Sequence, residues 1–219
     1  MTHSVKLIAM TQPIDGNMTT EDLVAFVARV SNPSNQNNKT TTKKLLKYLA
    51  REKHWSPFEM VDIVLEIETT RDIARQILRH RSFSFQEFSQ RYADPTGLGF
   101  EVSEARLQDT VNRQNSIETN DTELHEDWDL RQQVVINSAR AAYEWAIQHG
   151  IAKEQARKVL PEGLTMSRMY MKGSIRSWIH YCDLRMGNGT QKEHREVATL
   201  CWDKVLNVVP SLKDVLAKE

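Results

Sequence analysis

Glycine and cysteine are scarce in this chain, and its acidic and basic side chains balance. The 219 residues include eight glycines and two cysteines, and 29 basic side chains face 29 acidic ones. The glycines form neither a GxGxxG turn nor a phosphate-binding P-loop. Zero net charge removes the overall attraction that nucleic acids and anionic membranes exert on basic proteins. A binding site for an anion must therefore be local.

Extended apolar segments are also missing. No stretch reaches the roughly 18 to 20 residues of a membrane span, and the amino terminus does not resemble a signal peptide. Cys182 and Cys201 form no CxxC pair, and the seven histidines form no HExxH motif. We therefore expect a soluble cytoplasmic protein without a membrane or nucleic-acid partner, without a bound metal, and with two buried structural cysteines.

Hydrophobic periodicity predicts a mixed order of helices and strands. Strands are expected at residues 4–10, 61–68 and 164–171, and a polar loop at 32–42. Helices are expected after Thr19, around Leu45 to Leu49, and at residues 70–78, 124–149, 174–185 and 191–209, with a short one ending at Val159. This order predicts a helix-rich α+β fold around a small antiparallel sheet, in a single domain over residues 1–219.

Charge is segregated along the chain. Residues 71–91 hold five arginines and no lysine against two carboxylates, whereas residues 118–129 hold six acidic side chains and no lysine or arginine. Exposed ion pairs would be an ordinary reason for such charges, but each contributes only about 0 to 1 kcal/mol. Arginine binds phosphate and carboxylate groups through two points, so this arginine-rich segment indicates an anion site.

The segment RHRSFSFQEFSQR, residues 79–91, combines three guanidinium groups with hydroxyl groups, a carboxylate and phenylalanines. Guanidinium and hydroxyl groups suit phosphate, aromatic rings suit a stacked base, and a carboxylate accepts from a sugar or base. The pattern therefore favours a nucleotide. For Phe83 and Phe85 the stronger interpretation is that partial burial holds the loop in place.

This segment resembles the signature RHRxxSxxxxSxR of the flavin-dependent thymidylate synthases and matches each fixed position. Further similar elements are ARVS at residues 28–31, HWSPFE at 54–59, ARKVLP at 156–161, SIR at 174–176 with LR at 184–185, and QKEHR at 191–195. The resemblance implies reductive methylation of deoxyuridine monophosphate (dUMP) to dTMP, without a cysteine nucleophile. Methylenetetrahydrofolate would give the carbon, FAD would carry the hydride and NADPH would be the reductant. It also implies a homotetramer whose active sites lie between subunits.

The resemblance assigns roles to individual positions. The dUMP-binding residues would be Gln76, Arg79, Glu87, Phe88, Ser89, Gln90, Arg91, Arg157 and Arg185. The FAD-binding residues would be Ser31, Ser56, Arg79, His80, Arg81, Glu87, Ser174, Ile175, Arg176 and His180. Arg185, Ser89 and His54 would be catalytic, with Arg185 stabilising an anionic uracil ring.

Three of these positions leave alternatives open. Ser89 lacks an obvious general base nearby in sequence, so a hydrogen-bond donor is favoured over a nucleophile. His54 could instead cap the end of a helix. Ser174 stands where the family usually has asparagine, as does Gln86, so the flavin contact of Ser174 is open.

Two other functions fit the same residues. Interleaved arginines and phenylalanines also occur on proteins that stack single-stranded nucleic acid, although zero net charge and the acidic segment oppose a long phosphate track. The remaining alternative is a protein that binds flavin or nucleotide without turnover.

Overall fold

A four-stranded antiparallel sheet forms the centre of the fold. The computed structural model describes residues 3–216, and its sheet has the order β1-β2-β6-β3. The strands are β1 (Ser4–Met10), β2 (Asp62–Thr70), β3 (Ser84–Glu87) and β6 (Met166–Ser174). The expected α+β class and antiparallel pairing are confirmed.

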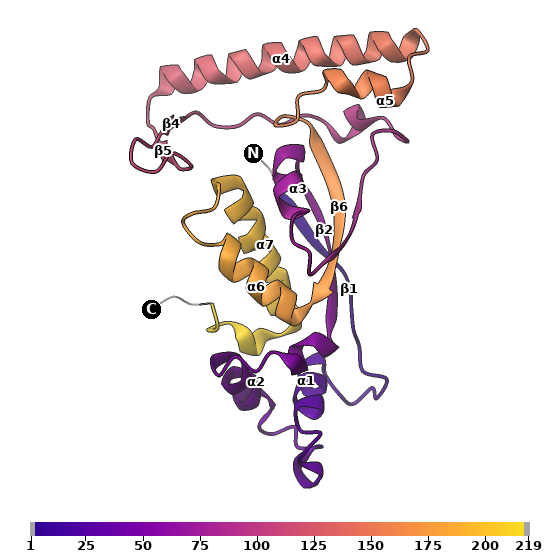
Figure 1. Cartoon of the computed structure of the whole chain (residues 1–219), viewed down its shortest axis with the longest axis vertical. Coiled ribbons are helices and arrows are strands. Elements are labelled where there is room, and N and C mark those ends of the chain that lie inside the picture. The colour runs from indigo at the N-terminus through magenta and orange to yellow at the C-terminus, as the bar shows by residue number, and fades with distance from the viewer. Residues whose placement is uncertain (1–2, 217–219) are drawn as a thin grey trace.

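The described part of the chain also forms seven α-helices. They are α1 (Thr20–Ala28), α2 (Thr42–Arg51), α3 (Arg71–Ile77), α4 (Thr122–Gln148), α5 (Lys153–Ala156), α6 (Ile175–Arg185) and α7 (Lys192–Val208). In Figure 1, α6 and α7 pack beside the sheet, α1 and α2 lie at one end, and α4 and α5 cross the other end.

The sheet buries one face because its strands alternate apolar and polar residues. On β2, Ile63, Leu65 and Ile67 are fully buried. Leu65 is paired with Met171 of β6, which is also fully buried. Each such apolar side chain contributes about 1.5–3 kcal/mol relative to an exposed one.

The opposite face of the sheet carries pairs of complementary polar side chains. Tyr170 donates to Glu66 over 2.8 Å, and Lys6 donates to the other oxygen of Glu66 over 3.1 Å. Two residues further along each strand, on the same face, Arg168 donates to Glu68 over 2.7 Å. These cross-strand pairs explain the polar half of the alternation in β2.

One local prediction was wrong, and one local element was missed. The segment after α3 was expected to be a loop throughout, but residues 84–87 form β3, because their backbone completes the sheet beside β6. A hairpin of β4 (Arg106–Gln108) and β5 (Ser116–Glu118) was not expected either. Both strands are short, and the apolar alternation that reveals a strand needs a longer run.

Helix α4 exposes much of the apolar side that its sequence predicts to be buried. Asp121 caps its start by accepting from the backbone of Leu124, and Gly150 adopts a positive φ just beyond its end. Ala139 and Ala146 are buried as expected, but Trp128 and Val135 are 44% and 47% exposed. In Figure 1 this helix lies across the end of the molecule, where no other helix covers its outer side.

Both cysteines are buried and carry free thiols, as predicted. Burial raises the pKa of each thiol, which removes the reactive thiolate at neutral pH. Among residues 3–216 no helix is both long and apolar enough to cross a membrane, and no group of three metal-binding side chains occurs there.

Candidate active site

The end of α3 and the end of α6 meet through His80 and Arg185. The Nε atom of Arg185 donates to Nε2 of His80 over 2.9 Å. Because Arg185 has only donors, His80 must be neutral there and carry its proton on Nδ1. Burial, and then the nearby charge of Arg185, lower the pKa of His80 to about 4. The contact holds the guanidinium group of Arg185 beside the arginine-rich segment.

Gln76 belongs to the same group through a buried histidine. Its side-chain oxygen lies 3.3 Å from Nδ1 of His194, and its nitrogen donates to Gln191 over 2.8 Å. On the other side of His194, the hydroxyl of Tyr181 lies 3.1 Å from Nε2. The ring of Tyr181 also packs edge-on against His80, with centroids 4.8 Å apart.

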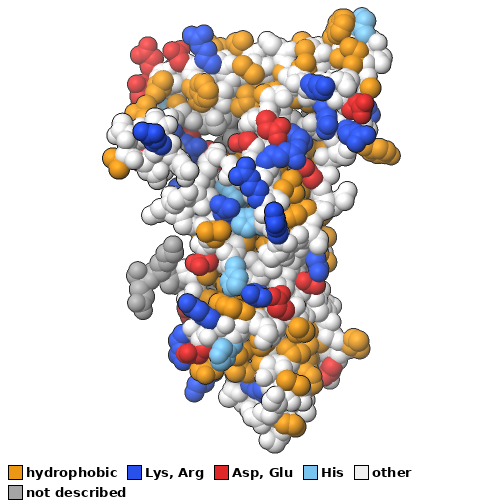
Figure 2. Space-filling view, viewed as in Figure 1, with side chains coloured by type: hydrophobic (Ala, Val, Ile, Leu, Met, Phe, Trp, Pro, Cys, Tyr) orange, Lys and Arg blue, Asp and Glu red, His pale blue; other side chains and the backbone are white. Residues whose placement is uncertain are grey.

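Arg79 and Arg81 are exposed near this group. Neither side chain has a hydrogen bond or ion pair with any residue between 3 and 216. Figure 2 shows basic side chains and histidines gathered down the middle of the visible face, over α3 and α6. Guanidinium groups without a protein acceptor can bind an anionic ligand without losing an existing ion pair.

A second group forms around Glu59 at the start of α6. Ser174 donates to one oxygen of Glu59 and Arg176 to the other, each over 2.6 Å. The bond from Ser174, and then Arg176, lower the pKa of Glu59. Ser174 also caps α6 by accepting from the backbone of Ser177. Ser174 is therefore the N-cap residue of α6.

His180 and Trp55 extend this second group. Their rings meet edge-on with centroids 4.8 Å apart. Burial, and then Arg176, lower the pKa of His180. Of the other predicted flavin contacts, Ser31 and Ser56 are exposed and Ile175 is fully buried. Glu59 received no role in the sequence analysis, because its two partners lie more than 100 positions away along the chain.

His54 helps to end helix α2 through its backbone. Lys53 adopts φ of 59°, its amide donates to Ala50, and the amide of His54 donates to Leu49 over 2.8 Å. This is the Schellman pattern of helix termination, here with lysine in the position that glycine usually takes. The exposed imidazole of His54 has Tyr48 as a ring neighbour, at a centroid distance of 6.1 Å. The backbone amide of His54 thus caps the end of α2, whereas its imidazole makes no hydrogen bond to a helix carbonyl within residues 3–216.

Glu87 lies apart from both groups, against the start of α3. It accepts from Ser167 over 3.0 Å and from Arg75 over 3.2 Å. Arg71 is 3.7 Å from the same carboxylate. Its neighbour Gln86 is exposed on β3.

Ser89 and Arg91 form a third group after β3. They line an open hollow of about 450 Å³ with Tyr92, Lys153 and Glu154. Arg91 is paired with Glu154 at 3.6 Å. Nearby in sequence, Gln90 is buried, Phe88 is half-buried, and Arg157 has no partner side chain in the described range. No hydrogen bond or ion pair within residues 3–216 joins Ser89 or Arg91 to Arg79 or Arg185.

Phe83 and Phe85 pack against the hydrophobic core, which confirms that they hold the arginine-rich segment in place. The ring of Phe83 lies 4.8 Å from that of Trp178 and covers Gly173 of β6. A Cβ atom at Gly173 would lie 2.4 Å from Phe83. Glycine at this position therefore gives the ring the space it occupies.

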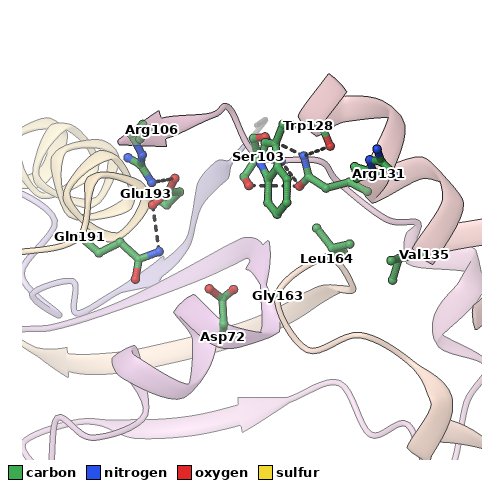
Figure 3. Close-up of a pocket in the computed structure, with 11 residues that line it drawn as sticks. Asp72, Ser103, Arg106, Trp128, Arg131, Val135, Gly163, Leu164, Gln191 and Glu193 are labelled. Atoms are coloured by element: carbon green, nitrogen blue, oxygen red, sulfur yellow. Dashed lines mark hydrogen bonds and ion pairs between the residues drawn. The ribbon is translucent and has the colours of Figure 1, made fainter. Parts of the chain in front are cut away.

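A separate cavity of about 340 Å³ lies between α3, α4 and the start of α7 (Figure 3). Asp72, Trp128 and Arg131 line it together with Gln191 and Glu193. None of the residues predicted to bind dUMP or FAD lines this cavity. The QKEHR element at residues 191–195 was recognised in the sequence as a motif. That its residues Gln191 and His194 contact Gln76 is visible only in the tertiary structure.

Known proteins resemble this chain over most of its length. A family model described as "Thymidylate synthase complementing protein" matches residues 14–211. A flavin-dependent thymidylate synthase from Synechocystis sp. is 52% identical over 198 residues, which cover 89% of this chain and 90% of that protein. A probable flavin-dependent thymidylate synthase from Paramecium bursaria Chlorella virus 1 is 47% identical over 214 residues, covering 97% and 98%.

Solved structures share the fold. A UMP/dUMP methylase from Streptomyces cacaoi, bound with 5-Br dUMP, has a TM-score of 0.83 and 25% identity, and the match covers 99% of this chain and 95% of that one. The same methylase bound with 5-Br UMP has a TM-score of 0.84. From the family match, the curated relatives and the shared fold, this chain belongs to the flavin-dependent thymidylate synthase family.

Proposed function

We propose that this chain methylates dUMP to dTMP, with methylenetetrahydrofolate as carbon donor and a flavin as hydride carrier. The observation that carries the proposal is the contact of Arg185 with His80 inside the RHR element. This contact holds a planar cation where Gln76 and the unpaired Arg79 also lie. A cation fixed beside a uracil ring stabilises its anionic form and so raises electron density at C5.

The nucleotide would be held by Gln76, Arg79 and Arg185 together with the third group, which contains Ser89 and Arg91. Ser89 acts in this proposal as a hydrogen-bond donor. Its hydroxyl has no histidine or carboxylate acceptor among residues 3–216, which a nucleophilic serine needs. Ser89→Ala is therefore expected to weaken dUMP binding and to retain measurable turnover.

The residues present fit FAD. Its diphosphate needs acceptor-free cations, and Arg79 and Arg81 are exposed without protein partners in the described chain. When bound, reduced FAD would supply a hydride for the new methyl group, and NADPH would be the reductant that regenerates it. The free thiols of Cys182 and Cys201 are compatible with the reducing cytoplasm, which is the proposed location.

A second copy of the chain would complete the site. In one protomer the third group is not joined to Arg185, and α4 presents exposed Trp128, Val134 and Trp145. Burying such side chains favours self-association. In a homotetramer with active sites between subunits, each site would combine the Arg185 group of one subunit with the Ser89 and Arg91 group of its neighbour.

Complementation tests this arrangement. Arg185→Ala and Arg91→Ala are each expected to abolish most activity, and tetramers reassembled from both variants are expected to regain part of it. Intact sites then arise wherever two unaltered groups meet. Mixtures that stay as inactive as the separate variants would contradict a site shared between subunits.

Two measurements test the activity itself. The purified protein is expected to show flavin absorbance bands and to release tritium from dUMP labelled at C5. Absence of flavin bands after FAD is added and the excess removed would contradict the flavin. Flavin binding without tritium release would indicate a binder without turnover, and salt-dependent oligonucleotide binding would indicate the nucleic-acid alternative.

A further inference from the structure

A directional chain of hydrogen bonds runs from Glu193 to Tyr181 and passes through Gln76. Its first link is the carboxylate of Glu193, which is 5% exposed and hydrogen-bonded by Arg106 on one oxygen. The other oxygen accepts from Nε2 of Gln191 over 3.0 Å. Figure 3 shows both contacts beside the cavity. An ionised carboxylate only accepts, so Gln191 must turn its amide nitrogen toward it.

Each later link follows from the one before. With its nitrogen on Glu193, Gln191 presents oxygen to Gln76, which donates to it over 2.8 Å. Gln76 then presents its own oxygen to Nδ1 of His194, which must carry the proton. Nε2 of His194 is left without a proton and accepts from the hydroxyl of Tyr181. One carboxylate thus orders two amides and one imidazole tautomer.

Burial makes this order specific. His194 is fully buried and Tyr181 is 1% exposed, so water does not reorder the inner end of the chain. Burial, then Arg185 and His80, lower the pKa of His194 to about 3. The imidazole is therefore neutral and has a single proton to place. Gln191, which is exposed, is the link most open to water.

We propose that Glu193 is a positioning residue, which acts through Gln191 and His194 to fix which end of the Gln76 amide faces the nucleotide. This inference rests on the proposed function, because Gln76 is assigned there to dUMP. With the order fixed, Gln76 keeps one free N–H and one free lone pair in constant places. A ligand then finds a donor and an acceptor already oriented, without the cost of ordering them.

The substitution Glu193→Gln tests this order with a change of one atom. Arg106 only donates, so it holds the oxygen of the new amide and turns the nitrogen toward Gln191. Gln191 and Gln76 must then both reverse, and His194 must move its proton from Nδ1 to Nε2. Nitrogen-15 NMR of the imidazole distinguishes the two tautomers. We expect the Nδ1–H form in the wild type and the Nε2–H form in the variant.

Kinetics give the second readout. Reversal of Gln76 costs about one hydrogen bond to the ligand, so KM for dUMP is expected to rise about three- to tenfold. The value of kcat is expected to change less. Glu118→Gln is the matched control, since Glu118 accepts from Lys192 and lies outside the chain of bonds. It is expected to change neither the tautomer nor KM.

A second variant guards against misfolding of the first. Gln191→Leu interrupts the chain at an exposed side chain and is expected to raise KM to a similar extent. The double variant is expected to be no worse than the worse single one, because both break one unit. Additive effects, or an unchanged tautomer in Glu193→Gln with unchanged KM, would overturn the proposal. If the wild type bound no dUMP, the proposed function and this role of Gln76 would both be contradicted. The change of the His194 tautomer in Glu193→Gln would still be observed.

Discussion

The Nε atom of Arg185 donates to Nε2 of His80 over 2.9 Å, across 105 positions of sequence. The contact requires a neutral imidazole, because a protonated His80 has no acceptor and repels the guanidinium group. Burial and Arg185 lower the pKa of His80 to about 4, so the contact persists at neutral pH. Acid is expected to break it.

The first prediction concerns the pH dependence of stability. The unfolded chain protonates His80 near its ordinary pKa of 6.5, whereas the folded chain does so near 4. The unfolded state therefore binds more protons between these values, and the free energy of unfolding must fall as pH drops from about 6.5 to about 4. Urea denaturation at fixed protein concentration is expected to show this fall.

His80→Gln should make that fall shallower, since glutamine can accept from Arg185 without titrating. Part of the dependence should remain, because the pKa of His194 is lowered to about 3. His149→Gln is the control, because His149 is exposed at the end of α4. Equal slopes for His80→Gln and the wild type would contradict the assignment.

The second prediction concerns Ser174, which both caps α6 and donates to Glu59. Ser174→Ala loses both bonds and is expected to lower the free energy of unfolding by about 1–2 kcal/mol. The pKa of Glu59 is expected to rise. Ser174→Asn is the matched variant, because asparagine caps helices as well as serine does. Chemical denaturation measures the free energy of unfolding of both variants. An equal decrease in Ser174→Ala and Ser174→Asn would contradict the capping role of Ser174.

The third prediction concerns the space at Gly173. Gly173→Ala places a methyl group 2.4 Å from the ring of Phe83 and is expected to cost about 1–3 kcal/mol of unfolding free energy. Displacing Phe83 should also disturb Arg81, which lies two residues earlier in the chain, and weaken flavin retention. Adding Phe83→Leu should recover part of the stability. Gly163→Ala, where no atom lies within 4 Å, serves as control. An equally small effect at both glycines would contradict the packing argument.

The fourth prediction concerns Lys53, whose φ of 59° is strained for any residue with a Cβ atom. Lys53→Gly is expected to raise the free energy of unfolding by about 1 kcal/mol, because glycine adopts this conformation without strain. Lys53→Ala keeps the strain and should give no gain. Thermal and urea denaturation measure the difference, and a gain in the alanine variant would point to the lysine charge instead.

The sequence predicts those secondary-structure elements that depend on interactions between residues close together in the chain. The alternation around Ile63 and Leu65 predicts β2 because opposite faces of a strand meet core and solvent. The capping box of Thr19 with Asp22 fixes the start of α1, and Gly150 follows the end of α4. The RHR signature likewise identified the family, because its spacing is written in consecutive residues.

Only the tertiary structure decided which side chains meet. Glu59 receives Ser174 and Arg176 from more than 100 positions away, and Glu193 reaches Gln76 through Gln191. Periodicity places such groups on a face but leaves their partner unspecified, since the partner depends on how the elements pack. For the same reason β3 was hidden in the sequence, as its strand form comes from the free edge of β6 that it completes. The sequence by itself therefore determined the helices, most of the strands and the kinds of functional side chain that are present. The packing of elements distant in sequence determined which of these side chains contact and orient one another.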